Sequence, residues 1–196
     1  VLNECMHSHG GFDHNIQTIR IVSLLESKYY NFKGLNLSIE TIDGLVKHNG
    51  PVNDTKKIVS ILGKNFFKNK INFKKNASLE AQLASISDDI AYNSHDLEDG
   101  LRANLYKIED LRNIPILSEV INKHKKFIKT KGTELMIRQM IRDIINEMVN
   151  DVIDNTQKNI KEKNIKNIKD VYNDKDLLVN FSEEMSYFDS RIKSFL

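Results

Sequence analysis

The feature that most constrains this chain is the helical periodicity of residues 79–101, because it separates apolar from acidic side chains. At about 100° per residue, six apolar residues fall within roughly 40° of one direction. They are Leu79, Leu83, Ile86, Ile90, Leu97 and Leu101. The opposite side carries a polar set made of Asp88, Tyr92, His95, Asp96 and Asp99. The pattern predicts one long helix with a buried apolar stripe and an acidic face.

The simplest interpretation of this acidic face is a solvated helix surface. Such a surface usually carries Lys and Arg residues that balance the acids, yet neither type occurs between Lys75 and Arg102. Small residues such as Ala84 and Ala91 leave room beside the carboxylates. The imbalance favours a functional role for the face, and the solvated surface stays open as the alternative.

Other segments also show helical spacing, and none alternates in the manner of a strand. Asp13 is expected to cap a helix near the start, a short helix is expected from Ile39, and Gly50-Pro51 should end it. Residues 56–76 are expected to form a helix followed by a loop. Ser78 is expected to cap the long helix. The sequence therefore predicts an all-α protein.

The second half of the chain continues this pattern. Pro115 is expected to start a helix, and apolar spacing predicts another from Leu135 to Ile153. A last amphipathic helix is predicted from Leu177 to Phe195. Residues 158–176 are rich in Lys, Asn and Ile, and we expect them to be partly exposed.

Composition limits the class of protein. The 196 residues suit one ordinary domain, and 29 Lys+Arg against 27 Asp+Glu give no strong field for nucleic acid or membrane. Nucleic-acid binding by the Lys-rich segments 64–75 and 158–169 is therefore the weaker interpretation. A single Cys5 excludes an internal disulfide and fits a reducing cytoplasm, where we expect the protein to be. No apolar run approaches the roughly 20 residues of a membrane span.

Four short blocks, in this order along the chain, resemble the bacterial deoxyguanosinetriphosphate triphosphohydrolase-like proteins of the HD-domain superfamily. The blocks are Gly11-Phe12-Asp13-His14-Asn15, Gly34-Leu35-Asn36-Leu37, Val46-Lys47-His48-Asn49-Gly50-Pro51 and Asp88-Asp89-Ile90-Ala91-Tyr92. The resemblance runs from residue 1 to the C-terminus. It implies part of an HD-type helical bundle, forming a single unit with the C-terminal part of the HD domain in about 1–112 and a further helical region in about 113–196.

The resemblance also implies an activity. Family members hydrolyse a deoxynucleoside triphosphate (dNTP) to a deoxynucleoside and inorganic triphosphate, using a divalent metal, Mg²⁺ or Mn²⁺, that activates the attacking water. The expected partner is therefore a dNTP, and full-length members are expected to form homo-oligomers.

Roles for five residues follow from the same resemblance. Asp88 corresponds to the family's last metal ligand. Tyr92 corresponds to the tyrosine against the deoxyribose, and Asp96 to the acid that binds the 3′-hydroxyl. His14 corresponds to a catalytic histidine near the phosphates, where it would donate a proton or orient water. Lys47 would supply positive charge to the triphosphate.

The residue spacing agrees with the first three of these roles, and alternatives stay open for the other two. Positions i, i+4 and i+8 of a helix rise by about 6 Å per step along one face, as a metal, a sugar and a hydroxyl acceptor along one substrate require. His14 is otherwise a solvent-exposed histidine at a helix start, and Lys47 is otherwise a surface lysine.

The family's other metal ligands, one His and a His-Asp pair, belong upstream of Val1 by this resemblance. His95 and Asp96 are also a His-Asp pair, but they lie after the glycine-rich block instead of before it, so they do not correspond to the family's pair. Cys5, His7 and His9 are also weak candidates for metal ligands, and we expect a structural or incidental role. A single carboxylate rarely holds a divalent ion, so the metal is not expected to be held by this chain alone.

The chain is therefore expected to be the C-terminal portion of such a protein, arising from a split gene, a truncated product or a cloned fragment. We expect weak or no activity from it alone. The alternative from another functional class is a non-catalytic remnant that binds nucleotide or oligomerises with a full-length partner.

Overall fold

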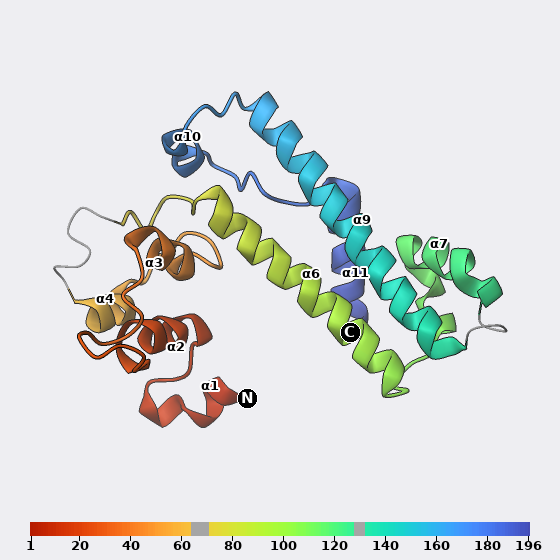
Figure 1. Ribbon diagram of the computed structural model, residues 1–196, viewed down its shortest axis with the longest axis horizontal. Coiled ribbons are helices and arrows are strands. Elements are labelled where there is room, and N and C mark those ends of the chain that lie inside the picture. The colour runs from red at the N-terminus through yellow and green to blue at the C-terminus, as the bar shows by residue number, and fades with distance from the viewer. Residues whose placement is uncertain (64–70, 128–131) are drawn as a thin grey trace. The chain divides into compact units, whose positions relative to one another are not determined.

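The computed structural model describes residues 1–63, 71–127 and 132–196. Within these ranges every regular element is a helix, which confirms the predicted all-α class (Figure 1). By packing, the chain divides into two compact units. The first holds Val1–Ser85 and Ile165–Leu178, and the second holds Ile86–Asn164 and Val179–Leu196. Since these units group residues by packing, the family-based division near residue 112 stays a prediction.

The first unit consists of short helices and the start of one long helix. Its elements are α1 (Leu2–Cys5), η1 (His7–His9), α2 (His14–Arg20), the π-helical turn η2 (Ile21–Leu25), α3 (Ile39–Val46), α4 (Lys56–Leu62), the first turns of α6 (Leu79–Arg102) and α10 (Ile168–Asn173). α2 packs on α3 and α4, and the core between them contains Ile19, Ile42, Val46 and Ile58. The predicted loop after α4 falls partly on residues 64–70, outside the described residues.

Side-chain caps start two helices of this unit, α2 and α6, where the sequence predicts them. The Asp13 carboxylate accepts a hydrogen bond from the Ile16 N–H at 3.0 Å, and the Ser78 hydroxyl accepts one from the Ala81 N–H at 3.3 Å. Both bonds satisfy N–H groups that a helix start leaves without a partner.

Gly34 belongs to one of the four sequence blocks, and its surroundings require glycine. Its φ is +68°, and a Cβ there would collide with the backbone of Ser23 in η2. The next N–H, of Leu35, donates to the Val22 carbonyl at 2.7 Å. This hydrogen bond holds the segment around Gly34 and Leu35 against the π-helical turn.

The second unit is built from longer helices. Its elements are the rest of α6, η3 (Ile108–Asn113), α7 (Pro115–His124), η4 (Lys125–Phe127), α9 (Thr133–Glu162) and α11 (Glu183–Phe195). α7 starts at Pro115 as predicted and packs on α9. Fully buried residues of this unit include Leu97, Leu111, Leu117, Met140, Ile144, Met148, Phe188 and Ile192.

Two boundaries predicted from the sequence are wrong. The last helix begins at Glu183 rather than Leu177, because Ser182 is held by Asp151 of α9, whose carboxylate accepts from both its N–H and its hydroxyl. Ser182 then caps the Met185 N–H. In addition, α9 continues to Glu162, and α10 forms within the Lys/Asn/Ile-rich run.

Among the described helices, none combines the length and the apolar character that crossing a membrane requires.

Candidate functional site

The acidic face of α6 forms as predicted. The helix is uninterrupted from Leu79 to Arg102, so Asp88, Tyr92 and Asp96 follow one another on one face at four-residue spacing. Asp88 is exposed, the Tyr92 side chain is 67% exposed and Asp96 is half-buried. The face therefore presents an accessible aromatic ring between two carboxylates.

The apolar stripe is confirmed in the part of α6 that belongs to the second unit, where Ile86, Ile90, Leu97 and Leu101 are buried. It is not confirmed at Leu83, which is 50% exposed. In the first turns of α6 the packed side carries small residues instead. A Cβ on Gly44 of α3 would lie 2.9 Å from the Ala81 Cβ, and the Ser85 hydroxyl donates to the His48 carbonyl at 2.8 Å. Leu83, on the other side of the helix, faces away from this contact.

A lysine from another helix reaches the acidic face, which the local sequence does not show. Lys193 of α11 lies 2.9 Å from the Asp189 carboxylate and 3.5 Å from that of Asp89. Burial lowers the pKa of Lys193, but these carboxylates outweigh that effect and raise it. Asp189 also accepts a 2.6 Å hydrogen bond from the buried Asn93 amide. Lys193 thus lies beside Asp89 at the edge of the acidic face, although its nearer partner is Asp189 of its own helix.

Tyr106 supports the turn of α6 that carries Asp96. Its hydroxyl donates to the carbonyls of Leu97 at 3.1 Å and Asp96 at 3.3 Å. Burial raises the pKa of Tyr106, and the charges of Asp96 and Asp99 raise it further. Sequence reasoning missed this residue, and the only signal for it was an unexplained glycine, Gly100, inside a long helix.

His14 is the first residue of α2 and is exposed. The loop before it is held in place, because Lys57 donates to the Gly10 carbonyl at 2.9 Å and the Phe12 N–H donates to the Asn3 side chain at 2.9 Å. The position agrees equally with the catalytic role and with an exposed histidine at a helix start, so the role stays a prediction.

Lys47 is not a surface lysine, because its side chain is only 2% exposed. Its Nζ lies 2.7 Å and 3.0 Å from the two carboxylate oxygens of Asp43 and donates to the Asn76 carbonyl at 3.3 Å. The ring of Tyr172 lies 5.5 Å away, measured from Nζ to the ring centroid. Burial raises the pKa of Asp43, and the hydrogen bond and charge of Lys47 oppose that shift. In this arrangement Lys47 belongs to a buried ion pair.

The five predicted site residues are thus distributed over both units. His14 and Lys47 belong to the first, and Asp88, Tyr92 and Asp96 belong to the second.

The described residues bring no three His, Cys, Asp or Glu side chains together in a way that would hold a metal ion. This applies to the surroundings of Asp88 and to the segment with Cys5, His7 and His9. The residues described around Asp88 therefore do not by themselves fit a divalent metal centre.

Two arginines, Arg138 and Arg142, share one face of α9. This spacing alone would allow them to reach phosphates or to pair with Asp143 or Glu147. Arg138 instead pairs with Glu134 at 2.7 Å, and Arg142 donates to the Gln139 side chain at 2.6 Å. The Asp143 carboxylate is already occupied by Lys123 and His124.

No protein-family model matches the chain. Curated proteins are similar to it over its full length. The chain is 49% identical to a deoxyguanosinetriphosphate triphosphohydrolase-like protein of Pelagibacter ubique, of which it covers 53%. It is 39% identical to the protein of that name from Parvibaculum lavamentivorans, with 50% covered, and 36% identical to that of Rhodopseudomonas palustris, with 51% covered. The chain spans about half the length of these relatives. Over its whole length the chain is therefore similar to about half of bacterial deoxyguanosinetriphosphate triphosphohydrolase-like proteins.

Proposed function

We propose that this chain supplies the sugar-binding face of a dNTP triphosphohydrolase, which converts a dNTP to a deoxynucleoside and inorganic triphosphate. The observation that carries the proposal is the uninterrupted α6 face with Asp88, Tyr92 and Asp96 at four-residue spacing, in a chain similar throughout to proteins named for that reaction.

The exposed ring of Tyr92 offers an apolar surface on which a deoxyribose packs. A ring lying against C2′ leaves no room for a 2′-hydroxyl, so ribonucleotides are disfavoured. Asp96 follows after a rise of about 6 Å, and its carboxylate accepts a hydrogen bond from the 3′-hydroxyl. In this proposal Tyr92 selects deoxyribose over ribose, and Asp96 positions the sugar.

The phosphate end of the substrate involves the other residues. Asp88 is the proposed ligand of a divalent ion, Mg²⁺ or Mn²⁺. The described residues do not complete a metal centre around it. His14 is the proposed catalytic group beside the phosphates. Lys47 is proposed to donate a hydrogen bond and supply positive charge to the triphosphate. This role requires its Nζ to leave Asp43.

A cytoplasmic, homo-oligomeric enzyme with a dNTP rather than nucleic acid as its partner is part of this proposal. The near balance of 29 Lys+Arg and 27 Asp+Glu supports only the last part, that nucleic acid is not the partner, because nucleic-acid binding usually needs a clear excess of positive charge.

Triphosphate release tests the proposal. The assay compares this chain with a longer protein in which the remaining half of a relative is joined to it. With dGTP, the longer protein is expected to release triphosphate and deoxyguanosine in equal amounts, and the chain alone little or none. Release of orthophosphate or pyrophosphate would contradict the proposed reaction. Saturable dGTP binding without hydrolysis would favour the non-catalytic nucleotide-binding alternative.

A further inference from the structure

The loop that follows α6 folds back onto the helix instead of leading away from it. Asn104 has a φ of +56°, and its N–H donates to the Leu101 carbonyl at 3.2 Å. The N–H of Leu105 donates to the Gly100 carbonyl at 3.0 Å. This pair of hydrogen bonds is the Schellman ending of a helix, which reverses the chain direction. The next residue, Tyr106, therefore lies alongside the last turns of α6.

Gly100 gives the ring of Tyr106 its place against the helix. Any side chain at position 100 would collide with this ring. The ring also packs edge-on against Phe195 of α11, at a centroid distance of 4.8 Å. Contacts with α6 and α11 therefore fix the ring, and they hold the hydroxyl at its end against α6.

The Tyr106 hydroxyl contacts the turn of α6 that carries the proposed acceptor of the 3′-hydroxyl. Its one O–H is shared between the carbonyls of Leu97 at 3.1 Å and Asp96 at 3.3 Å. Burial raises the pKa of Tyr106, and the charges of Asp96 and Asp99 raise it further. The phenol is therefore protonated at neutral pH and can donate to this turn.

The same turn has a second anchor on its N-terminal side. Asn93 is only 2% exposed, and its amide donates to the Asp189 carboxylate of α11 at 2.6 Å. Asp96 lies between Asn93 and Gly100 along the helix. Because α6 is held at both points, the position of the Asp96 turn depends on both, and Tyr106 provides the C-terminal one.

Packing alone does not require a hydroxyl at this position. A phenylalanine ring would fill the same space between Gly100 and Phe195. In an unbroken helix the Asp96 and Leu97 carbonyls already accept hydrogen bonds from the N–H groups four residues later. The hydroxyl is thus an additional donor to a turn whose own bonds are made, and its effect is on the position of that turn.

We propose that Tyr106 is a positioning residue for the 3′-hydroxyl of the substrate. Its hydroxyl holds the α6 turn where the Asp96 carboxylate can accept the hydrogen bond from the deoxyribose. Hydrogen bonds weaken steeply with distance and angle, so a small shift of this turn affects substrates that carry a 3′-hydroxyl. The inference rests on the proposed function and adds to it a residue that does not itself touch the substrate.

Steady-state kinetics of the longer protein test the proposal with two nucleotides. One is dGTP, and the other is 2′,3′-dideoxyguanosine triphosphate (ddGTP), which lacks the 3′-hydroxyl. Tyr106→Phe keeps the ring and should lower kcat/KM for dGTP by roughly 2–13-fold, the range for one neutral hydrogen bond. The value for ddGTP should change by less than about twofold, below the smallest effect of that bond. A general loss of structure would lower both values together, so an equal loss for both nucleotides overturns the proposal.

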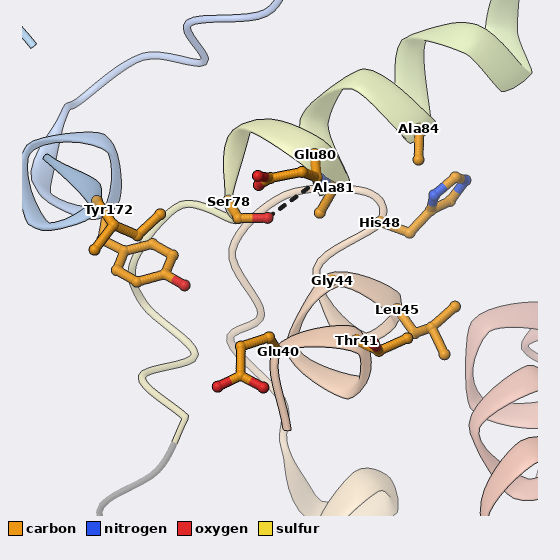
Figure 2. Close-up of a pocket in the computed structure, with 11 residues that line it drawn as sticks. Glu40, Thr41, Gly44, Leu45, His48, Ser78, Glu80, Ala81, Ala84 and Tyr172 are labelled. Carbon is orange, nitrogen blue, oxygen red and sulfur yellow. Dashed lines mark hydrogen bonds between the residues drawn. The ribbon is translucent and has the colours of Figure 1, made fainter. Parts of the chain in front are cut away.

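Two control variants separate this inference from the proposed function. Asp96→Ala should remove the preference for dGTP over ddGTP. Tyr172→Phe is the matched control, because Tyr172 is also half-buried but lines a pocket of the first unit between α3, the first turns of α6 and α10 (Figure 2). It should keep the parental preference. If Asp96→Ala keeps that preference, the sugar role of Asp96 is wrong and this inference fails with it. If only Tyr106→Phe and the control keep it, the proposed function stands and the role of Tyr106 is wrong.

Hydrogen exchange in this chain gives a test that needs no catalytic activity. The N–H groups of Gly100 and Leu101 close the helical hydrogen bonds of the supported turn. In Tyr106→Phe these two amides should exchange roughly 2–13-fold faster, while the Ile90 amide of the same helix keeps its parental rate. Tyr172→Phe should change none of the three rates. Parental exchange at Gly100 and Leu101 in Tyr106→Phe would show that the hydroxyl does not hold this turn, and it overturns the inference whether or not the longer protein hydrolyses dGTP.

Discussion

The ring of Tyr106 fills the space beside Gly100 in which any side chain at position 100 would have to lie. The Tyr106 hydroxyl donates to the Leu97 carbonyl at 3.1 Å, and the ring packs edge-on against Phe195 at a centroid distance of 4.8 Å. Glycine inside a helix costs about 1 kcal/mol relative to alanine. The close approach of Tyr106 explains why this cost is tolerated within α6, one turn after Asp96.

Gly100→Ala should therefore destabilise the protein although alanine is the better helix former. Overpacking against Tyr106 outweighs the gain in helix propensity, and we expect a net loss of about 1–2 kcal/mol in the free energy of unfolding. Urea denaturation followed by circular dichroism measures it. Ser87→Ala, at an exposed position of the same helix, is the control and should stabilise slightly. A Gly100→Ala variant as stable as that control would show that the ring does not occupy this space.

Asp143 should make the stability of the protein sensitive to acid. Burial alone would raise its pKa, but hydrogen bonds from Lys123, His124 and Gln139 lower it from 3.8 to about 2. The carboxylate therefore contributes stability above its ordinary pKa, and this contribution is lost as the pH falls from about 4 toward 2. At pH 7, Asp143→Asn should cost at most about 2 kcal/mol, since Lys123 is largely exposed.

Urea denaturation between pH 7 and pH 3 checks this behaviour. The stability difference between the parent and Asp143→Asn should shrink as the pH approaches 3. Asp154→Asn, at an exposed position of the same helix, should show a small difference at every pH. A difference for Asp143→Asn that stays constant down to pH 3 would mean that the carboxylate is not held in its charged form.

Lys47→Met should unfold the protein more readily, because it leaves the Asp43 carboxylate buried without its partner. Breaking one side of a buried ion pair costs about 3–5 kcal/mol, and thermal denaturation measures the loss. The double variant Asp43→Leu/Lys47→Met removes both charges and should recover most of the stability. If it also keeps the parental dGTP affinity in the longer protein, Lys47 has no role at the triphosphate.

Asp96 and Tyr92 should have separable effects on catalysis in an active, longer form of the protein. Asp96→Ala removes the acceptor of the 3′-hydroxyl and should lower kcat/KM for dGTP by roughly 10–150-fold, the value of a charge-assisted hydrogen bond. Tyr92→Ala should instead lower the dGTP/GTP preference, since a cavity opens where the 2′-hydroxyl is excluded. The measurement is kcat/KM for both nucleotides in both variants. A Tyr92→Ala enzyme with the parental preference would make the sugar-platform role wrong.

Local signals were sufficient for most helices and for the order of residues on α6. Asp13 caps α2, Pro115 starts α7, and α6 runs without a break past Asp88, Tyr92 and Asp96. Caps and hydrophobic spacing act within one or two turns of the chain, so they can be recognised without tertiary information.

Local signals failed where a partner comes from a distant part of the chain. Leu83 is exposed because the early turns of α6 pack through Ala81 and Ser85. The final helix starts at Glu183 because Asp151 holds Ser182. The first error arose because periodicity assigns residues to faces but does not say which face meets another element, and the second because the residue that holds Ser182 is 31 positions away in the chain.

The sequence by itself therefore determined the helical class, the long helix and the face that carries the proposed sugar-binding residues, because these depend on spacing within one helix. Only the tertiary structure decided that Lys47 is buried against Asp43 and Asn76. It alone also formed the pocket between α3, the first turns of α6 and α10. A buried ion pair and a pocket between helices require segments far apart in the chain to meet, and no local pattern encodes that meeting.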